Sequence, residues 1–317
     1  LAKAIASPLM EYLIGTVWLV NMFFILAVIY AVMMFFGFLL IKRPADWVYD
    51  PATSHVSRAE ILRKPVFWGI WIAFYINITC GLALISQEKD ILHDVLRAFP
   101  QYANLSPAKF AAAISGIIGL VLAVDSVFNT AGRVGFSTLS DHLKRRETVY
   151  QVIFIMSIAV CLLQIFTNSI GNALLWAVLA MLFLVNAGYG GGFSTLPVLL
   201  DQHFGTKTVS TTRGLTLSAW AFAGLSGNQL ASFVVAHAPD QAHRYAALIP
   251  VITGLFVVAL ISISLVKYLG DRNVTKAVED RGWAAAKQRF CRSRAHRSHQ
   301  SMYVTILAES LLLLLST

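Results

Sequence analysis

Three polar residues stand four positions apart within one apolar stretch of the chain: Asp125, Asn129 and Arg133. Four residues advance an α-helix by about 40° beyond a full turn, so the three side chains share one side of a helix. Asp125 and Arg133 then lie about 12 Å apart along the axis, which predicts that Asn129 or water connects them. The stripe is a candidate lining of a central cavity. The alternatives are that Arg133 extends to the membrane interface and that Asp125 pairs with another helix.

Further polar and aromatic side chains within apolar stretches are candidates for the same lining. A charged side chain inside a membrane costs about 2.5–3.5 kcal/mol, so Lys3, about 18 Å from the next loop, faces either a cavity or an ion-pair partner. Aromatic belts lie at membrane interfaces, whereas Tyr75, Tyr189 and Trp220 fall away from the ends of their stretches. Asn77 joins them as a candidate. Core packing and interhelical hydrogen bonds are the alternatives for these residues.

A glycine-rich segment, 186–197, lies in another apolar stretch. Glycines let helices approach closely, and a proline inside a helix favours a kink. A gating hinge and tight packing alone are both consistent with this pattern. The residues concerned are Gly188, Gly190, Gly191, Gly192 and Pro197.

The composition predicts that a lipid bilayer surrounds these residues. The chain is 57% hydrophobic and 13% charged, with a mean hydropathy of +0.67, whereas soluble domains carry about 25% charged residues. A membrane-spanning helix needs about 20 apolar residues, and backbone groups in lipid must pair within the helix. The fold class is therefore an all-α, polytopic membrane protein. Seven runs qualify as spans: 17–41, 66–86, 110–136, 148–168, 172–200, 212–236 and 244–269.

Local signals predict where some helices begin. Ser106 followed by Pro107 is typical of an N-cap and first turn. Ser57 and Glu60 have the spacing of a capping box, which predicts a short surface helix over 57–64.

Basic residues in the connections predict the orientation and the domains. The side richer in Lys and Arg is expected to be cytoplasmic; its residues are Lys42, Arg43, Arg58, Arg63, Lys64, Lys144, Arg145, Arg146 and Lys207. Because the chain begins at Leu1 within apolar sequence, we expect 1–42 to hold the last spans of a truncated N-terminal bundle. The expected remainder is a cytoplasmic linker (43–65), a C-terminal six-helix bundle (66–269) and a poorly ordered, basic cytoplasmic tail (270–317).

One connection carries a recognisable motif. The sequence STLSDHLKRR, 137–146, resembles the signature loop of major facilitator transporters, Gly-x-x-x-Asp-Arg/Lys-x-Gly-Arg-Arg. Ser137, His142 and Lys144 depart from that pattern. The positions that match it, and that the resemblance implies for gating, are Asp141, Arg145 and Arg146.

Four neighbouring segments are similar to the oxalate/formate antiporter branch of that superfamily: 64–71, 129–133, 190–197 and 203–207. The resemblance covers about residues 1–269. It implies a small organic anion as substrate, with Arg133 as the basic residue that faces it. Oxalate-transporting members place a Lys in a Gly-Leu-x-x-x-Ala-Lys stretch, where this chain has Trp220. A dianion needs more charge compensation in a low dielectric, so we expect a monocarboxylate rather than oxalate.

These observations predict a secondary active transporter that works by alternating access, as exchange or as proton symport. A carboxyl group in the membrane can take up and release a proton, which makes Asp125 the candidate coupling residue. We expect a multi-pass protein of the plasma (inner) membrane, monomeric when complete, with no enzymatic activity, cofactor, metal or nucleic-acid partner. A seven-span receptor or sensor without transport activity is the alternative.

Overall fold

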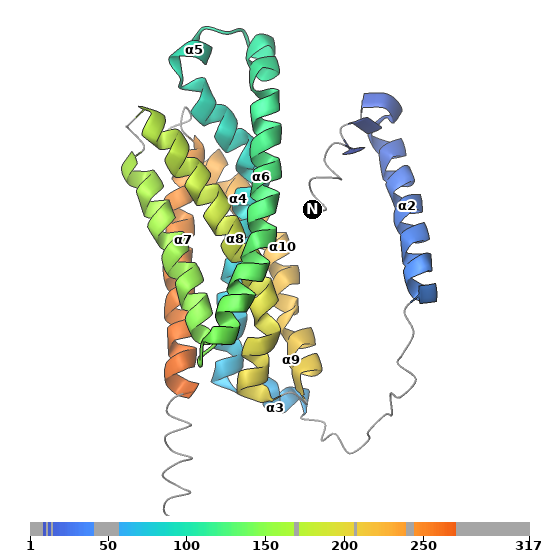
Figure 1. Ribbon diagram of the computed structural model, residues 1–317, viewed down its shortest axis with the longest axis vertical. Coiled ribbons are helices and arrows are strands. Elements are labelled where there is room, and N and C mark those ends of the chain that lie inside the picture. Colours follow the sequence, from blue (N-terminus) through green and yellow to red (C-terminus); the bar gives the residue numbers. More distant parts are fainter. Residues whose placement is uncertain are drawn as a thin grey trace, which may run out of the picture. The chain divides into compact units, whose positions relative to one another are not determined.

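The computed structural model describes residues 9–10, 12–13, 15–40, 57–167, 171–205, 208–238 and 244–270. These residues form helices joined by short connections (Figure 1), which confirms the all-α class. Packing divides the chain into two units, Leu1–Val266 and Lys267–Thr317. Three of the sequence predictions lie wholly or largely outside the described residues: Lys3, the linker and the basic tail.

Six described helices are long and apolar enough to cross a membrane, and six of the predicted spans coincide with them. They are α2 (Leu19–Leu40), α4 (Pro65–Arg97), α6 (Pro107–His142), α7 (Glu147–Thr167), α8 (Gly171–Phe204) and the helix Tyr245–Gly270. As the Ser106–Pro107 pair predicts, α6 begins at Pro107 with Ser106 as its N-cap residue.

The seventh predicted span, 212–236, differs from a single continuous helix. It is divided at Leu217 into α9 (Val209–Thr216) and α10 (Ser218–Ala236). The hydroxyls of Thr216 and Ser218 donate to carbonyls of the preceding turn, at 2.8 and 2.7 Å. Such side-chain bonds compete with the helical ladder, and they coincide with the break.

Two short helices and one long extension lie in the connections. The predicted surface helix is present as α3 (Arg58–Leu62), although Ser57 makes no side-chain cap bond. We expected the span 66–86 to end before the charged residues that follow it. Instead α4 continues to Arg97, and α5 (Pro100–Ala103) follows. The extension is helical because Ile91, Leu92 and Leu96 bury one side of it.

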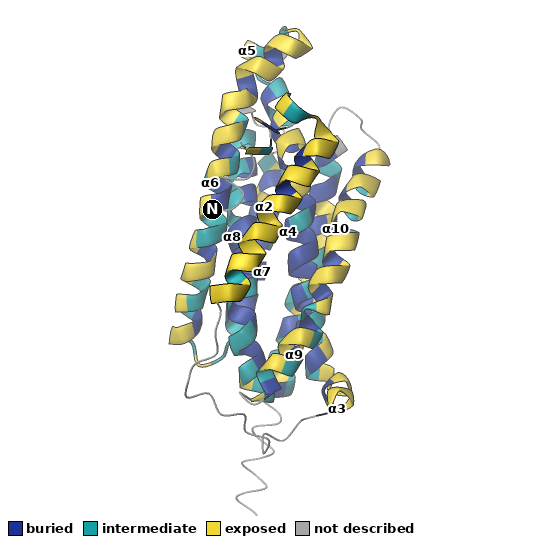
Figure 2. Cartoon of the chain, turned by 90° about the vertical axis from the view of Figure 1, so that its right-hand side faces the viewer, coloured by how far each residue is buried: buried dark blue, intermediate teal, exposed yellow. Residues whose placement is uncertain are grey.

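Helix α8 is central to the described bundle. It packs against α6, α7 and α4, and α4 packs in turn against α10. Figure 2 shows buried residues along α8 and α4, whereas α2 is exposed over most of its length. Large aromatic side chains fill the interior between these helices, among them Phe74, Tyr150, Phe154 and Phe256.

Glycines allow α6 and α8 to touch through their backbones. A Cβ atom on Gly132 would lie 2.1 Å from the carbonyl oxygen of Ala187, and one on Gly190 would lie 2.3 Å from the carbonyl oxygen of Asn129. The next two glycines of α8 leave room for side chains of α6 and α4, since added Cβ atoms would meet Phe136 and Asn77 at 2.3 Å; these glycines are Gly191 and Gly192. Helix α8 runs unbroken through all of them.

This contact predicts different outcomes for two glycines of α6. Gly132→Ala would force the two backbones apart, and overpacking of this kind costs about 1–3 kcal/mol. Gly135 has no atom within 4 Å of an added Cβ, so Gly135→Ala should be neutral or slightly stabilising. Thermal unfolding of the purified protein in detergent measures both. Equal unfolding temperatures for the two variants would contradict the close contact.

Candidate functional site

The polar residues of the stripe on α6 are connected to one another by a chain of hydrogen bonds that passes through one residue of α8. The Nε of Arg133 donates to Oδ1 of Asn129 at 3.3 Å, and Nδ2 of Asn129 donates to Oδ1 of Asn186 at 2.8 Å. Nδ2 of Asn186 then donates to the carboxylate oxygen Oδ2 of Asp125. The structure thus places Asn129 between Asp125 and Arg133, as the helical spacing predicts, and adds Asn186 from α8.

Each side-chain amide in this chain of hydrogen bonds also donates to a backbone carbonyl. Nδ2 of Asn129 donates to the carbonyl of Asn186 at 3.2 Å, and Nδ2 of Asn186 donates to the carbonyl of Asp125 at 3.3 Å. Asp125 and Asn186 are buried, with 1% and 5% of their surfaces exposed, whereas Arg133 is exposed. The chain of bonds therefore leads from a buried carboxyl group to a guanidinium on the surface of the bundle.

An aromatic ring lies against the guanidinium. The Cζ atom of Arg133 lies 5.7 Å from the ring centroid of Phe193, a cation–π distance. The Phe193 ring meets Tyr189 and Trp220 edge to face, with centroids 5.3 and 5.7 Å apart. Two of the predicted lining residues, Tyr189 and Trp220, therefore gather with Arg133 around Phe193, a residue that the sequence analysis did not single out.

The other two predicted lining residues with described positions take part in helix contacts. Asn77 is 2% exposed and donates to the carbonyl of Gly188 at 3.5 Å, so it joins α4 to α8. The hydroxyl of Tyr75 lies 2.8 Å from that of Ser226, and its ring stacks on Trp71, which joins α4 to α10. Among the described residues, no hydrogen bond links Asn77 or Tyr75 to Arg133.

The motif residues between α6 and α7 form a second polar cluster. Asp141 and Arg146 lie 3.9 Å apart as a partly exposed ion pair. Arg146 also donates from NH1 to the hydroxyl of Ser140 at 3.3 Å, and its backbone N–H donates to Gln202 at 2.9 Å. The connection between α6 and α7 is thereby attached to the end of α8.

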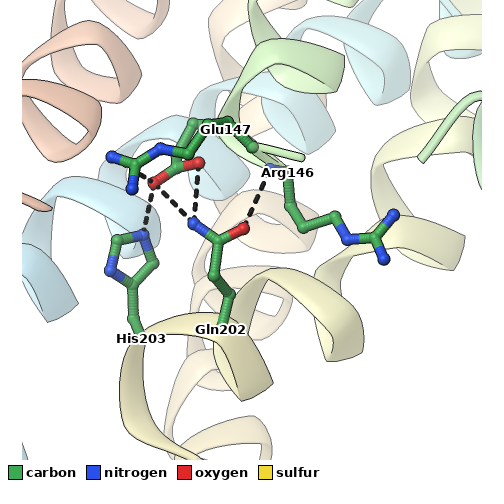
Figure 3. A network of polar contacts seen from close by, with 5 residues as sticks. Arg146, Glu147, Gln202 and His203 are labelled. Atoms are coloured by element: carbon green, nitrogen blue, oxygen red, sulfur yellow. Dashed lines mark hydrogen bonds and ion pairs between the residues drawn. The ribbon is translucent and has the colours of Figure 1, made fainter. Parts of the chain in front are cut away.

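Glu147, the first residue of α7, is the buried centre of this second cluster (Figure 3). Its side chain is fully buried, and Nε2 of Gln202 lies 2.9 Å from both of its carboxylate oxygens. Nε2 of His203 lies 2.8 Å away and a guanidinium nitrogen of Arg145 lies 3.8 Å away. A buried carboxylate needs such partners. Glu147 and Gln202 were not among the predicted site residues, although Glu147 directly follows the two arginines of the motif, and His203 begins the family-like segment 203–207.

The part of the chain that the structure describes contains no cluster of side chains suited to bind a metal ion. No three His, Cys, Asp or Glu residues gather there closely enough to hold an ion. The two described cysteines, Cys80 and Cys161, are buried free thiols.

The fold and the motif define the class of protein. The family model of the Major Facilitator Superfamily matches residues 1–228, and the chain belongs to this superfamily. It is a multi-pass membrane protein.

Two curated relatives place the chain more closely. It is 25% identical over 204 residues to the oxalate:formate antiporter of Oxalobacter formigenes, covering 64% of this chain and 43% of the relative. It is 27% identical over 209 residues to the uncharacterized MFS-type transporter YhjX of Escherichia coli K12, covering 64% and 46%. The matching part of the chain spans less than half the length of either relative. The resemblance that the motifs indicated is confirmed.

The second cluster predicts unequal effects for two acidic residues. Glu147→Gln replaces an acceptor by a donor that faces the amide of Gln202, and an unsatisfied buried group costs about 1–3 kcal/mol. Asp141→Asn removes one member of a pair whose acidic side chain is 74% exposed, and such pairs contribute about 0–1 kcal/mol. Thermal unfolding in detergent should therefore show a much larger loss for Glu147→Gln. A larger loss for Asp141→Asn would show that Glu147 does not stabilise this cluster.

Proposed function

We propose that the chain carries the anion-binding half of a secondary active transporter for a small organic anion, a monocarboxylate rather than oxalate, which works by alternating access. The observation that carries the proposal is Arg133, an exposed guanidinium on α6 that is held by Asn129 and lies over the ring of Phe193. A guanidinium positioned in this way can bind a carboxylate through two charge-assisted hydrogen bonds. The relative from Oxalobacter formigenes is named for two carboxylates, which is consistent with this substrate class.

The surroundings of Arg133 favour one negative charge over two. Trp220 occupies the position where the resemblance leads us to expect a second cation, and its ring adjoins Phe193. Aromatic rings present negative faces, so they do not compensate a second carboxylate. In the proposed site Arg133 binds the carboxylate, Asn129 orients Arg133, and Tyr189 and Trp220 line the path. Lys3, Tyr75 and Asn77 complete the proposed lining.

Asp125 is the proposed coupling residue, in a carrier that works as exchange or proton symport. It is buried and joined to Arg133 through two amides. A proton bound there could therefore affect the anion site. A pure exchanger has no need of such a proton, and Asp125 would then be a structural partner of Asn186.

We place the protein in the plasma (inner) membrane as a monomer, with the basic connections and the C-terminus on the cytoplasmic side. Residues 1–42 belong to the other bundle, 43–65 to the linker, 66–269 to the six-helix bundle and 270–317 to the tail. The proposed gating residues are Asp141, Arg145, Arg146, Gly190, Gly191 and Gly192. Membership of a superfamily of transporters favours transport over a seven-span receptor.

Arg133→Lys tests the anion ligand. The substitution keeps the charge and removes the planar fork, and a lost charge-assisted bond of about 1.5–3 kcal/mol corresponds to about a tenfold or greater fall in affinity. Uptake of radiolabelled formate, acetate and lactate by the full-length protein in proteoliposomes measures it. Arg97→Lys is the matched control, because Arg97 also lies over a phenylalanine ring, 4.8 Å from the centroid of Phe110. Equal affinities in the two variants would refute the role of Arg133.

Trp220→Lys tests the preference for one charge. An ammonium beside Arg133 could bind a second carboxylate, so the ratio of oxalate uptake to formate uptake should rise about tenfold or more. Trp220→Gln removes the ring without adding charge and should leave that ratio low. If both variants raise the ratio equally, the ring excludes oxalate by its size, and the charge argument is wrong.

A further inference from the structure

Arg133 and Asp125, at the two ends of the hydrogen-bond chain, determine which group donates and which accepts at each step between them. A guanidinium only donates, so Asn129 must present its carbonyl oxygen to Arg133 and its NH2 group to Asn186. Asn186 must then present its own NH2 group to Asp125. An ionised carboxylate only accepts, and it therefore suits this direction. A protonated carboxyl group carries a donor as well, and it also suits the opposite direction.

We propose that Asn186 and Asn129 form a relay that transmits the protonation state of Asp125 to Arg133. With Asp125 ionised, the relay holds Nε of Arg133 on Asn129. When a proton binds Asp125, its O–H donates to the carbonyl oxygen of Asn186, both amides reverse, and Asn129 turns its NH2 group toward Nε of Arg133. Two donors then face each other, so Arg133 leaves Asn129 and offers Nε and a terminal nitrogen to a substrate carboxylate. The inference rests on the proposed function, and it makes Asn186 a positioning residue.

The packing of α6 against α8 supports a relay with two defined directions. The NH2 groups of Asn129 and Asn186 also donate to backbone carbonyls across the helix contact, at 3.2 and 3.3 Å. Those bonds favour the direction seen in the structure, so the opposite direction requires the extra donor that a proton supplies. The backbones are held together by Gly132 and Gly190, and the amides can therefore reverse while the helices stay in place.

Other titratable groups, on the helices that pack against α6, could also make transport depend on pH, so their effect must be distinguished from that of Asp125. Helix α4 carries Glu88, which is 1% exposed, α8 carries Tyr189, and α7 carries the buried Cys161. On α6 itself the charged partner in the relay is Arg133. Glu88 and Glu147 are the other buried carboxyl groups among the described residues, and Glu147 is held by Gln202, His203 and Arg145 in the second cluster. Glu88 is therefore the main other source of a pH dependence, and Glu88→Gln belongs in the test.

The experiment is uptake of radiolabelled formate by the full-length protein in proteoliposomes, from about pH 6 to about pH 8, where formate stays ionised. For the wild-type protein the apparent affinity should rise as the pH falls, by at most about tenfold per pH unit for one coupled proton. Asn186→Leu should abolish this pH dependence and retain transport. Asn129→Leu should also lose the pH dependence, and only the pH profile of this variant is compared, because Asn129 itself positions Arg133.

The controls are Glu88→Gln and Asn228→Leu, an exposed amide on α10 outside the relay, and both should keep the wild-type pH profile. Asp125→Asn keeps the shape of the side chain and removes its titration. It should lose the pH dependence and pH-driven accumulation while formate-for-formate exchange survives, and it decides the outcome if the leucine variants fail to fold. A wild-type profile in any folded relay variant, or a wild-type affinity independent of pH, would overturn the relay. Failure of the wild-type protein to transport any monocarboxylate would instead refute the proposed function.

Discussion

The approach of α6 to α8 without intervening side chains is the constraint on which the candidate site depends. Helices packed through ordinary side chains lie about 8–10 Å apart, and short asparagine side chains would reach across that distance poorly. Gly132 and Gly190 bring the backbones into contact. As a result Asn129 and Asn186 can bond to each other and also to backbone carbonyls. The position of Arg133 beside Phe193 follows from the same contact. Gly190 touches Asn129, and Arg133 and Phe193 each lie about one turn beyond those two residues on their own helices.

The sequence predicts those parts of the structure that depend on periodicity within one helix. Apolar run length identifies six of the spans, and spacing by four residues places Asp125, Asn129 and Arg133 on one side. Neither signal gives the register between two helices. The pairing of Asn186 with Asp125, 61 residues away, depends on which turns of α6 and α8 stand at the same level, and no spacing within either helix determines that.

The same limit applies to charged residues. The apolar run predicted a span that ends at residue 86, but the apolar residues among the charged ones of 87–97 keep the helical period and bury one side of α4. Glu147 follows the arginines of the motif and has the appearance of a surface residue in the sequence. Its burial arises from Gln202 and His203, which the far end of α8 brings to it. Tertiary contacts, and not local composition, decide whether such a group is a surface charge or a structural centre.

The placement of Asp125 and Arg133 on one helix has an electrical consequence. Their charges are opposite, so the two groups cancel each other when the proposed site is empty. A monoanion on Arg133 together with a proton on Asp125 also adds no net charge. Moving one elementary charge through the membrane potential changes the free energy by about 2.3 kcal/mol per 100 mV, and these two groups would carry none in either state. A carrier built on them would draw on the proton concentration gradient and be insensitive to voltage.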